Sequence, residues 1–578
     1  MKTQLVTCSS DYKKNNKRKY YLGVFCNSDK IKYKPYFFNK KNTFYFDDTK
    51  NIENYRYLKK VSKKIFLFLA IKLNKFHKCK KDLKYWRIII YPWICYYVAT
   101  LNDRWKIISG IEKSKKKFWV KKFILDKNFL EIESTLDWIL KSQNGKFNNN
   151  LFNKIIEFKK LKNIEQVLEK NQMVLKKKGQ NFFFSFFNKI LFFLNLFFLH
   201  CNKIYFDKVL IKKSDFIKLC FRFKLLQIKN NTIFDNLNFN VNYNYNYRNT
   251  FKRKKNKNFE NFLFSELKNY TPKTFIEKYP LYLNTRIINK LKRKIILGFY
   301  SASFNDYFKI FVAESKLKKS RFIHAPHGAG CHLPKKYDVH FNYFKEISDK
   351  LIVTSQKIKK NKKEIFVPLK IFKDKIKKKN PYKLLICYHD LHRYIIRPTL
   401  FNLTPNINLK LFDDLVKNIT KLNPEIQRKI MFRGKENKEQ YFNKKFIKIF
   451  GKKKIEYINK KSFRTSIGES KIIICFLSQT SFTEILYNNI PVILIKDRHL
   501  ILSKKNIYKK FLENNILFNE IDEAFDFINA NWQNIDVWWN DKETQAAKNL
   551  FLKEFFYDEK KLKNNEWTSF LERELKKI

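Results

Sequence analysis

The segment from Lys294 to Ala325 constrains the fold more than any other part of this 578-residue chain. It holds an apolar run of strand length, "KIILGFY", then "FNDYFKIFVAESKLKK", whose apolar residues recur with helical spacing, and a second apolar run, "RFIHA". Two such strands joined by a helix pair in parallel. The loop after "RFIHA" therefore leaves the carboxyl edge of a parallel sheet, where open α/β sheets bind ligands.

The same alternation continues toward the C-terminus. "DKLIVTS" supplies a further strand, and after a lysine-rich linker near 356–380 come the strands "YKLLICYHD" and "KIMFRGKE" and the strand–loop–helix–strand segment "KIIICFLSQTSFTEILYNNIPVILI". We expect an α/β protein with two Rossmann-like, doubly wound domains that face a cleft. The predicted domains are residues 1–375 and 376–578, the second ending in helices.

The first 290 residues are predicted to carry helical insertions. "QLVTCS" and "YYLGVFCN" predict two strands near the N-terminus, and the apolar spacing from Tyr55 to about Ile111 predicts helix. Residues 114–250 show only helical pieces, a Phe-rich run and an Asn/Tyr-rich stretch typical of an exposed loop. We therefore place a helical insertion at about 50–290.

The charge of the chain is strongly positive, 122 − 52 = +70. The lysines are spread over the whole length, and Lys, Asn, Ile, Phe and Tyr are in excess together, which favours an A/T-rich genome over a dedicated nucleic-acid-binding role. The charge would still concentrate a phosphorylated substrate. Nine scattered cysteines without a CxxC pair speak against a disulfide framework and a structural zinc site.

One stretch, "FFFSFFNKILFFLNLFFL" (182–199), is apolar enough to be considered as a membrane-spanning helix. It approaches the roughly 20 apolar residues of a span, but Asn188, Lys189 and Asn195 interrupt it, and a central lysine costs about 2.5–3.5 kcal/mol. A buried helix, or one docked on an anionic inner leaflet, is favoured over a span. Since no signal peptide is visible, we expect a cytoplasmic protein, peripheral at most on the inner membrane face.

The loop after "RFIHA" reads "PHGAGCHLP" and gathers unusual residues. Gly328 and Gly330 allow close backbone approach and positive φ, so the loop can wrap a ligand with its amides. His327 stands at the strand end beside them and could take a proton from a hydroxyl near neutral pH. The alternative is a buried histidine bonded to a backbone carbonyl.

The other nearby histidines raise the question of a metal. His324 is on the strand and is expected to be structural, whereas His332 and His340 follow the loop. No HxxxH spacing and no carboxylate set accompanies them, and no Asp-x-Asp stands at a strand end. We predict neither a metal nor another cofactor.

A second loop, "SQTSFTEILYNNIP", begins a short helix after a buried strand. Ser481 and Glu484 fit an S-x-x-E capping box. The same helix N-terminus could bind an anion, with hydroxyl groups from Ser478, Thr480 and Ser481 available.

Two more strand ends carry polar groups. Arg433 in "FRGKE" could contact a phosphate or pair with Glu436. "CYHDLHRY" offers His389, His392 and Arg393. The convergence of such residues on carboxyl ends of strands favours a ligand site there.

These segments resemble a family of bacterial transferases of surface-carbohydrate biosynthesis. The likeness covers most of the chain in order: "LVTCSSDYKKNNKRKYYLGVFC", "KYWRIIIYPWICYYVATLNDRW", "DYFKIFVAE" before the histidine–glycine loop, "TSFTEILYNNIPVI" and "VWWNDKETQAAKNLFLKEFF". The family is distantly related to capsule Kdo transferases, polysialyltransferases and teichoic-acid glycerophosphotransferases. Its loop usually reads Gln-His-Gly-Gly, where this chain has Pro326 and Ala329.

The resemblance implies a GT-B-type fold, with an acceptor-side first domain and a nucleotide-donor second domain. It implies His327 as general base, and Thr480, Ser481 and Glu484 as the residues that hold the phosphate and ribose of the donor nucleotide. Their residue types and places at strand ends add Gly328, Gly330, Arg433 and Ser478 to the expected donor-binding residues. Arg87 and Arg104 are expected acceptor contacts, because arginine suits bidentate binding of a carboxylate or phosphate; the alternative for their segment is core packing by the neighbouring tryptophans.

The expected function is metal-independent, inverting transfer of a sugar from a nucleotide-activated donor to a cell-surface glycan or lipid-linked acceptor. One alternative is a phosphoglycerol or phosphosugar transferase that uses a CDP-linked donor. Another, motivated by the charge and the aromatic content, is a non-catalytic protein that binds nucleic acid or another polyanion. A third is a membrane-associated scaffold built around residues 182–199.

Overall fold

The protein is described by a computed structural model. The residues that the structure describes are 2–8, 19–26, 48–114, 116–170, 197, 199, 201–207, 209–225, 234, 237, 239–251, 257–299, 301–326, 328, 339–355, 362–367, 369, 376, 380–388, 394–396, 405–434, 441–457, 460–495, 505–556 and 566–578.

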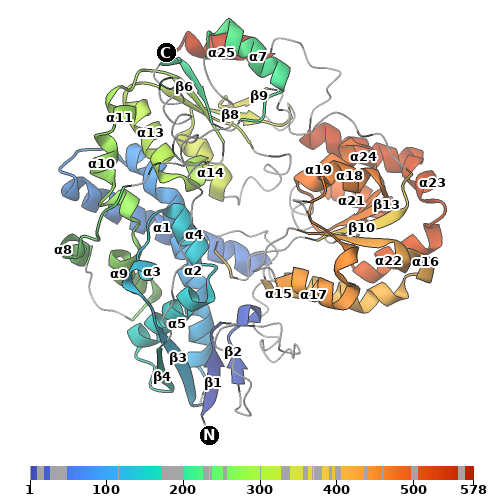
Figure 1. Ribbon diagram of the computed structural model, residues 1–578, viewed down its shortest axis with the longest axis horizontal. Helices are drawn as coiled ribbons and strands as arrows, with labels where there is room; N and C mark the ends of the chain where they lie inside the picture. The colour runs from blue at the N-terminus through green and yellow to red at the C-terminus, as the bar shows by residue number, and fades with distance from the viewer. Residues whose placement is uncertain are drawn as a thin grey trace.

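Three separate parallel sheets organise these residues (Figure 1). The first has the order β2-β1-β3-β4, with β1 at Thr3–Val6, β2 at Lys19–Tyr21, β3 at Phe118–Ile124 and β4 at Ile164–Lys170. The first N-terminal strand expected from the sequence is confirmed; the second is shorter than expected, since it ends at Tyr21 and Val24–Cys26 form a 3-10 helix. The other two were not expected, because lysines interrupt the apolar run of β3. One of them, Lys121, pairs with Glu169 of β4 at 2.7 Å.

Two long helices fill the centre of the N-terminal half. α1 (Asp48–Phe76) and α2 (Leu83–Glu112) confirm the helical pattern expected from Tyr55 to Ile111. From Tyr85 to Arg104 nearly every residue of α2 is buried, which is the pattern of a helix packed on all sides. Asp82 caps it by accepting a hydrogen bond from the Tyr85 amide at 2.7 Å. α2 is thus the element on which the surrounding helices pack.

The second sheet has five strands in chain order, β5-β6-β7-β8-β9. Their bounds are Ile204–Phe206, Ile295–Gly298, Arg321–His324, Lys350–Val353 and Glu364–Phe366. The expected unit of strand, helix and parallel strand is confirmed as β6, α13 (Asp306–Leu317) and β7. Apolar residues of α2, α13 and α14 (Val339–Ile347) pack on one face.

The opposite face of this sheet is covered by α7 (Lys213–Arg222) and the last helix, α25 (Glu566–Leu575). The chain therefore returns from the C-terminal sheet to the N-terminal half, and Figure 1 shows α25 and α7 side by side. Arg321 of β7 pairs with Glu574 at 2.8 Å. The domain division at 375/376 stays a prediction, and the structure adds that α25 shares the core of the five-stranded sheet.

The third sheet has six strands in the order β12-β11-β10-β13-β14-β15. Their bounds in chain order are Lys383–Cys387 (β10), Ile430–Gly434 (β11), Ile455–Tyr457 (β12), Ser470–Cys475 (β13), Val492–Ile495 (β14) and Leu517–Phe518 (β15). Counted from β10 this is the Rossmann order 3-2-1-4-5-6. The expected parallel α/β fold is confirmed.

Helices cover both faces of the six-stranded sheet. α15 (Pro405–Asn418), α16 (Pro424–Lys429) and α22 (Ile521–Asn531) contribute to one apolar core. α19 (Thr480–Tyr487), α21 (Lys505–Glu513) and α24 (Lys542–Phe555) contribute to the other. This sheet is therefore doubly wound.

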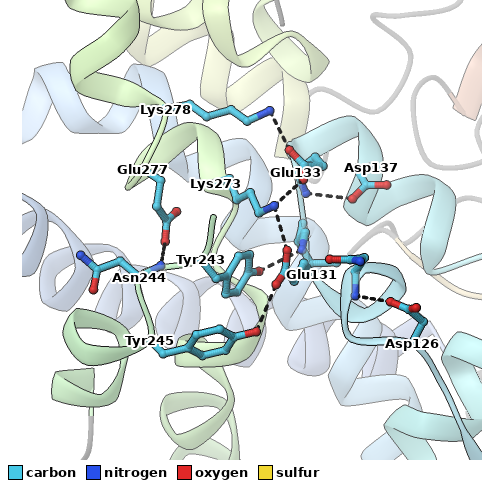
Figure 2. Close-up of polar contacts among 12 residues, drawn as sticks. Asp126, Glu131, Glu133, Asp137, Tyr243, Asn244, Tyr245, Lys273, Glu277 and Lys278 are labelled. Carbon is cyan, nitrogen blue, oxygen red and sulfur yellow. Dashed lines mark hydrogen bonds and ion pairs between the residues drawn. The ribbon is translucent and has the colours of Figure 1, made fainter. Parts of the chain in front are cut away.

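A network of ion pairs connects two segments of the helical insertion, one around Glu131 and Glu133 and the other around Lys273 and Lys278 (Figure 2). Lys273 lies 2.8 Å from both Glu131 and Glu133, and Lys278 lies 2.7 Å from Glu133. Burial alone would raise the pKa of Glu133, but the hydrogen bonds from the two lysines lower it. The network fixes the turn before α10 (Tyr279–Leu283) against the segment before α4 (Thr135–Lys141).

A buried carboxylate connects the same elements to α13. Asp306 accepts hydrogen bonds from the Thr135 amide at 2.8 Å and from the Thr274 hydroxyl at 2.5 Å, and it pairs with Lys309 at 2.7 Å. Asp306 begins the segment "DYFKIFVAE". Its role in the structure is to hold the start of α13 near the carboxyl end of β6.

No helix in the described part of the chain is both long and apolar enough to span a membrane. The Phe-rich run at 182–199 lies outside the described residues except for Phe197 and Leu199.

His77, near the end of α1, links three elements through its ring. The ring packs against Tyr279 at 4.3 Å and Trp86 at 6.1 Å, and its Nε2–H donates to the carbonyl of Phe275 at 2.9 Å. Burial lowers the pKa of His77 from 6.5 to about 4, although this backbone bond opposes the shift. His77 is therefore neutral in the folded protein at neutral pH.

We predict that His77 makes the free energy of unfolding depend on pH. Its contribution is complete above pH 6.5, where the unfolded chain is also neutral, and falls as pH drops toward 4, since only the unfolded chain then gains the proton. The loss should be about 3 kcal/mol. Urea unfolding of the wild type and of His77→Gln from pH 7 to 4 tests this. The variant should show the shallower dependence, and parallel curves would refute the assignment.

Candidate functional site

The strand order of the six-stranded sheet reverses between β10 and β13. The last residues of these strands, Cys387 and Cys475, lie side by side in register, and Arg433 at the end of β11 is the next partner outward. In open parallel sheets the crevice at such a reversal, outside the carboxyl ends, is where ligands bind. The candidate site is built from the segments that leave these strand ends.

α19 begins directly after β13 and starts at Thr480. Its N-cap is Gln479, which has an extended backbone and makes no side-chain capping bond. The expected capping box is wrong, because Ser481 already has helical backbone and cannot act as the cap. Gln479 therefore leaves the first-turn amides without the usual N-cap side-chain bond, and a helix start of this kind can bind an anion. Ser478 is buried just before this turn, and Ser481 is exposed.

The histidine–glycine loop reaches this helix start. A Cβ atom placed on Gly328 would lie 2.2 Å from Oγ1 of Thr480, so a side chain at this position would force Thr480 to shift. Close backbone approach is therefore the reason for Gly328. The expected positive φ is wrong for this residue, since Gly451 is the glycine with positive φ in the described part of the chain. His327 and Gly330 lie outside the described residues.

His324, the last residue of β7, packs against α14. Its ring stacks on Phe344 with 3.5 Å between centroids and 8° between planes. This contact supports the structural role expected from the sequence. His332 lies outside the described residues, as do the imidazole of His340 and the side chains of His389, His392 and Arg393.

Arg433 is buried beside the reversal point. It donates to the Ser466 hydroxyl at 2.6 Å and to the Lys461 carbonyl at 2.9 Å. Burial lowers the pKa of its guanidinium, and electrostatic interactions with Cys387, Glu456 and Glu484 act in the opposite direction. Glu484 on α19 makes the smallest of these contributions. Sequence reasoning missed Ser466 and Lys461, because they lie about 30 positions from Arg433 in no recognisable pattern.

Arg104 on α2 is fully buried. Its guanidinium donates to Oδ1 of Asn148 at 2.8 Å and to the carbonyl of Ile395 at 2.6 Å, and it lies 5.0 Å from the ring centre of Tyr394. Residues 394–396 belong to the chain that follows β10. Arg104 therefore links the centre of the N-terminal half to the segment returning from the reversal point, and its expected acceptor contact stays a prediction.

Arg87 lies on the same helix but faces α14. It forms an ion pair with Glu346, and its guanidinium stacks 4.1 Å from the Tyr91 ring centre. It lines a small pocket between α1, α2 and α14, together with Lys59, Asn342 and other side chains. α14 is the first described helix after the histidine–glycine loop. Arg87 is thus paired with Glu346 beside this pocket, and its expected contact with the acceptor stays a prediction.

The described residues contain no group of three or more His, Cys, Asp and Glu side chains that could hold a metal ion. The arrangement instead offers uncapped helical amides, hydroxyl groups and a buried guanidinium. These groups can bind and neutralise a phosphate.

The parallel α/β sheets agree with what the family comparison shows: the chain is a transferase. It belongs to the LIC12162 family of transferases, whose family model matches residues 3–571. The expected membership of a transferase family is confirmed at this level, and the relation to Kdo transferases and polysialyltransferases stays a prediction. A comparison with curated proteins found no match.

Two solved structures are similar to part of the chain. One is MurG of Acinetobacter baumannii, at 10% identity and a TM-score of 0.30, over 50% of this chain and 74% of that one. The other is the pneumococcal O-GlcNAc transferase GtfA in complex with UDP and GlcNAc, at 11% identity and a TM-score of 0.31, over 52% of this chain and 60% of GtfA.

We predict that Gly328→Ala lowers the melting temperature, because its methyl group would overlap Oγ1 of Thr480. The three atoms nearest to a Cβ at 328 all belong to Thr480, so Thr480→Ala should relieve the overlap with Oγ1. The double variant should therefore be more stable than Gly328→Ala alone, and the two changes should be non-additive by roughly 0.5–3 kcal/mol. Thermal unfolding of the four proteins measures this, and strict additivity would show that the two loops do not touch.

Proposed function

We propose that this transferase moves a sugar from a nucleotide-activated donor to a cell-surface glycan or lipid-linked acceptor, with inversion and without a catalytic metal. The observation that carries the proposal is the contact of Gly328 with Thr480. It brings the loop after β7 against the helix start after β13, and each belongs to the carboxyl edge of its own parallel sheet. A transfer reaction needs its two substrates at such a junction.

On the donor side, the leaving phosphate would lie at the first turn of α19. The amide groups of that turn and the hydroxyls of Thr480, Ser481 and buried Ser478 would bind its oxygens, with Arg433 supplying positive charge nearby. Glu484, one turn further along the helix, is suited to accept hydrogen bonds from ribose hydroxyls. These groups stabilise the charge that grows on the phosphate as the bond to the sugar breaks.

On the acceptor side, His327 would act as general base from the histidine–glycine loop. It takes the proton of the acceptor hydroxyl while that oxygen forms a bond to the anomeric carbon. The bond between the anomeric carbon and the phosphate oxygen breaks, and its electron pair leaves with the nucleotide. Gly330 would give this loop its reach, and Arg87 would contact a carboxylate or phosphate of the acceptor.

We expect one nucleotide among CMP, CDP, UDP and GDP to raise the melting temperature of the wild type. A nucleotide at about 100 times its Kd adds about 2.7 kcal/mol of stability. Ser481→Ala should reduce the shift, since it removes a hydroxyl from the phosphate site, and Thr465→Ala, which changes an exposed hydroxyl at the start of α18 (Phe463–Gly468), should not. If no nucleotide stabilises the wild type, the α19 site is refuted.

We expect His327→Ala to abolish transfer while leaving nucleotide binding intact. Loss of a general base costs about 10²–10⁴-fold in rate. The readout is release of the nucleotide selected by the thermal panel from sugar donors that carry it, alongside the thermal shift by that nucleotide. Retained turnover would exclude His327 as the base, and a transferred group that keeps its phosphate would favour the CDP-dependent phosphosugar reaction instead.

A further inference from the structure

The face of the five-stranded sheet opposite α2, α13 and α14 is covered by α7 and α25, which lie side by side near the C-terminus (Figure 1). α7 packs inward through Phe216 and Leu219, which share a core with Trp567 and Leu571 of α25. Arg222 and Glu572 connect the two helices at 2.9 Å. α7 is thus held firmly, with a defined face toward solvent.

That solvent face carries two large apolar side chains. Phe221 is 81% exposed and Ile217 is 54% exposed. They are four positions apart, so they point in directions only about 40° apart on a helix and form one apolar ridge. Four exposed lysines surround the ridge: Lys212 and Lys213 before it, Lys218 at its side and Lys224 beyond it. We call these six residues the α7 face.

The apolar ridge and the lysines around it together indicate what kind of partner the α7 face would bind. Phenylalanine and isoleucine side chains in water lose the free energy that burial would give them, and lysines around an apolar ridge are typical of helices that lie in a membrane interface. The four ammonium groups match the negative surface of an anionic bilayer. A nucleic acid would also attract the lysines, but it offers no apolar layer for the aliphatic Ile217.

We infer that the α7 face docks the protein on an anionic membrane surface, with Phe221 and Ile217 inserted among the lipid head groups and the lysines against the phosphates. The inference does not depend on the proposed sugar transfer, since it concerns other residues and a lipid partner. It also differs from the expectation for residues 182–199, because α7 lies after that run and inserts only two side chains.

The test is co-sedimentation of the full chain with vesicles of phosphatidylcholine containing phosphatidylglycerol, against phosphatidylcholine alone. The wild type should bind the anionic vesicles and release them as salt rises. Ile217→Ser/Phe221→Ser should weaken binding by about tenfold or more, because the apolar contribution is lost. The matched control is Val537→Ser, at an apolar side chain that is 72% exposed on the C-terminal half.

Three outcomes would overturn the inference. The first is equal binding by the wild type and the Ile217→Ser/Phe221→Ser variant while both keep the same melting temperature. The second is binding to anionic and neutral vesicles alike. The third is that Lys213→Glu/Lys218→Glu abolishes vesicle binding while Ile217→Ser/Phe221→Ser does not change it. If the wild type also binds heparin as tightly as it binds anionic vesicles, the α7 face would be a general polyanion site.

Discussion

Parallel pairing governs this structure, because every strand pair among the described residues is parallel. Parallel neighbours need a crossover connection, so helices cover the sheets and the carboxyl ends gather at one edge. Gly328, Arg433 and Ser478 all stand at or just after such ends. The outer crossovers present the remaining faces to solvent, and the α7 face is one of them.

Buried cations hold the segments that leave those edges. A guanidinium removed from water is costly unless its donors are bonded. Arg104 meets this condition with Asn148 and the carbonyl of Ile395, and Arg433 with Ser466 and the carbonyl of Lys461. Each arginine thereby ties a loop near the reversal point to a distant part of the chain. The strands bring these loops to one region, and the arginines hold them there.

Much of this organisation could be predicted from sequence where strands are buried on both faces. β6, β7, β10 and β13 are continuous apolar runs, and their ends located the candidate residues. β3 and β4 could not be predicted, since paired lysines and glutamates break their apolar pattern. The start of α19 was misjudged by two residues, because local spacing does not reveal where the backbone turns helical. The packing of α25 on the five-stranded sheet depends on contacts between residues more than two hundred positions apart, such as Arg321 and Glu574. The partners of Arg433 lie about thirty positions away from it. Local sequence patterns do not reveal contacts of either kind.

The central claim is that the loops after β7 and β13 form one transfer site. A crystal structure of the protein with its stabilising nucleotide tests it most directly. The account predicts a nucleotide phosphate within hydrogen-bonding distance of the first-turn amides of α19, with Gly328 beside it. A nucleotide bound elsewhere, with α19 making no contact to phosphate, would contradict it.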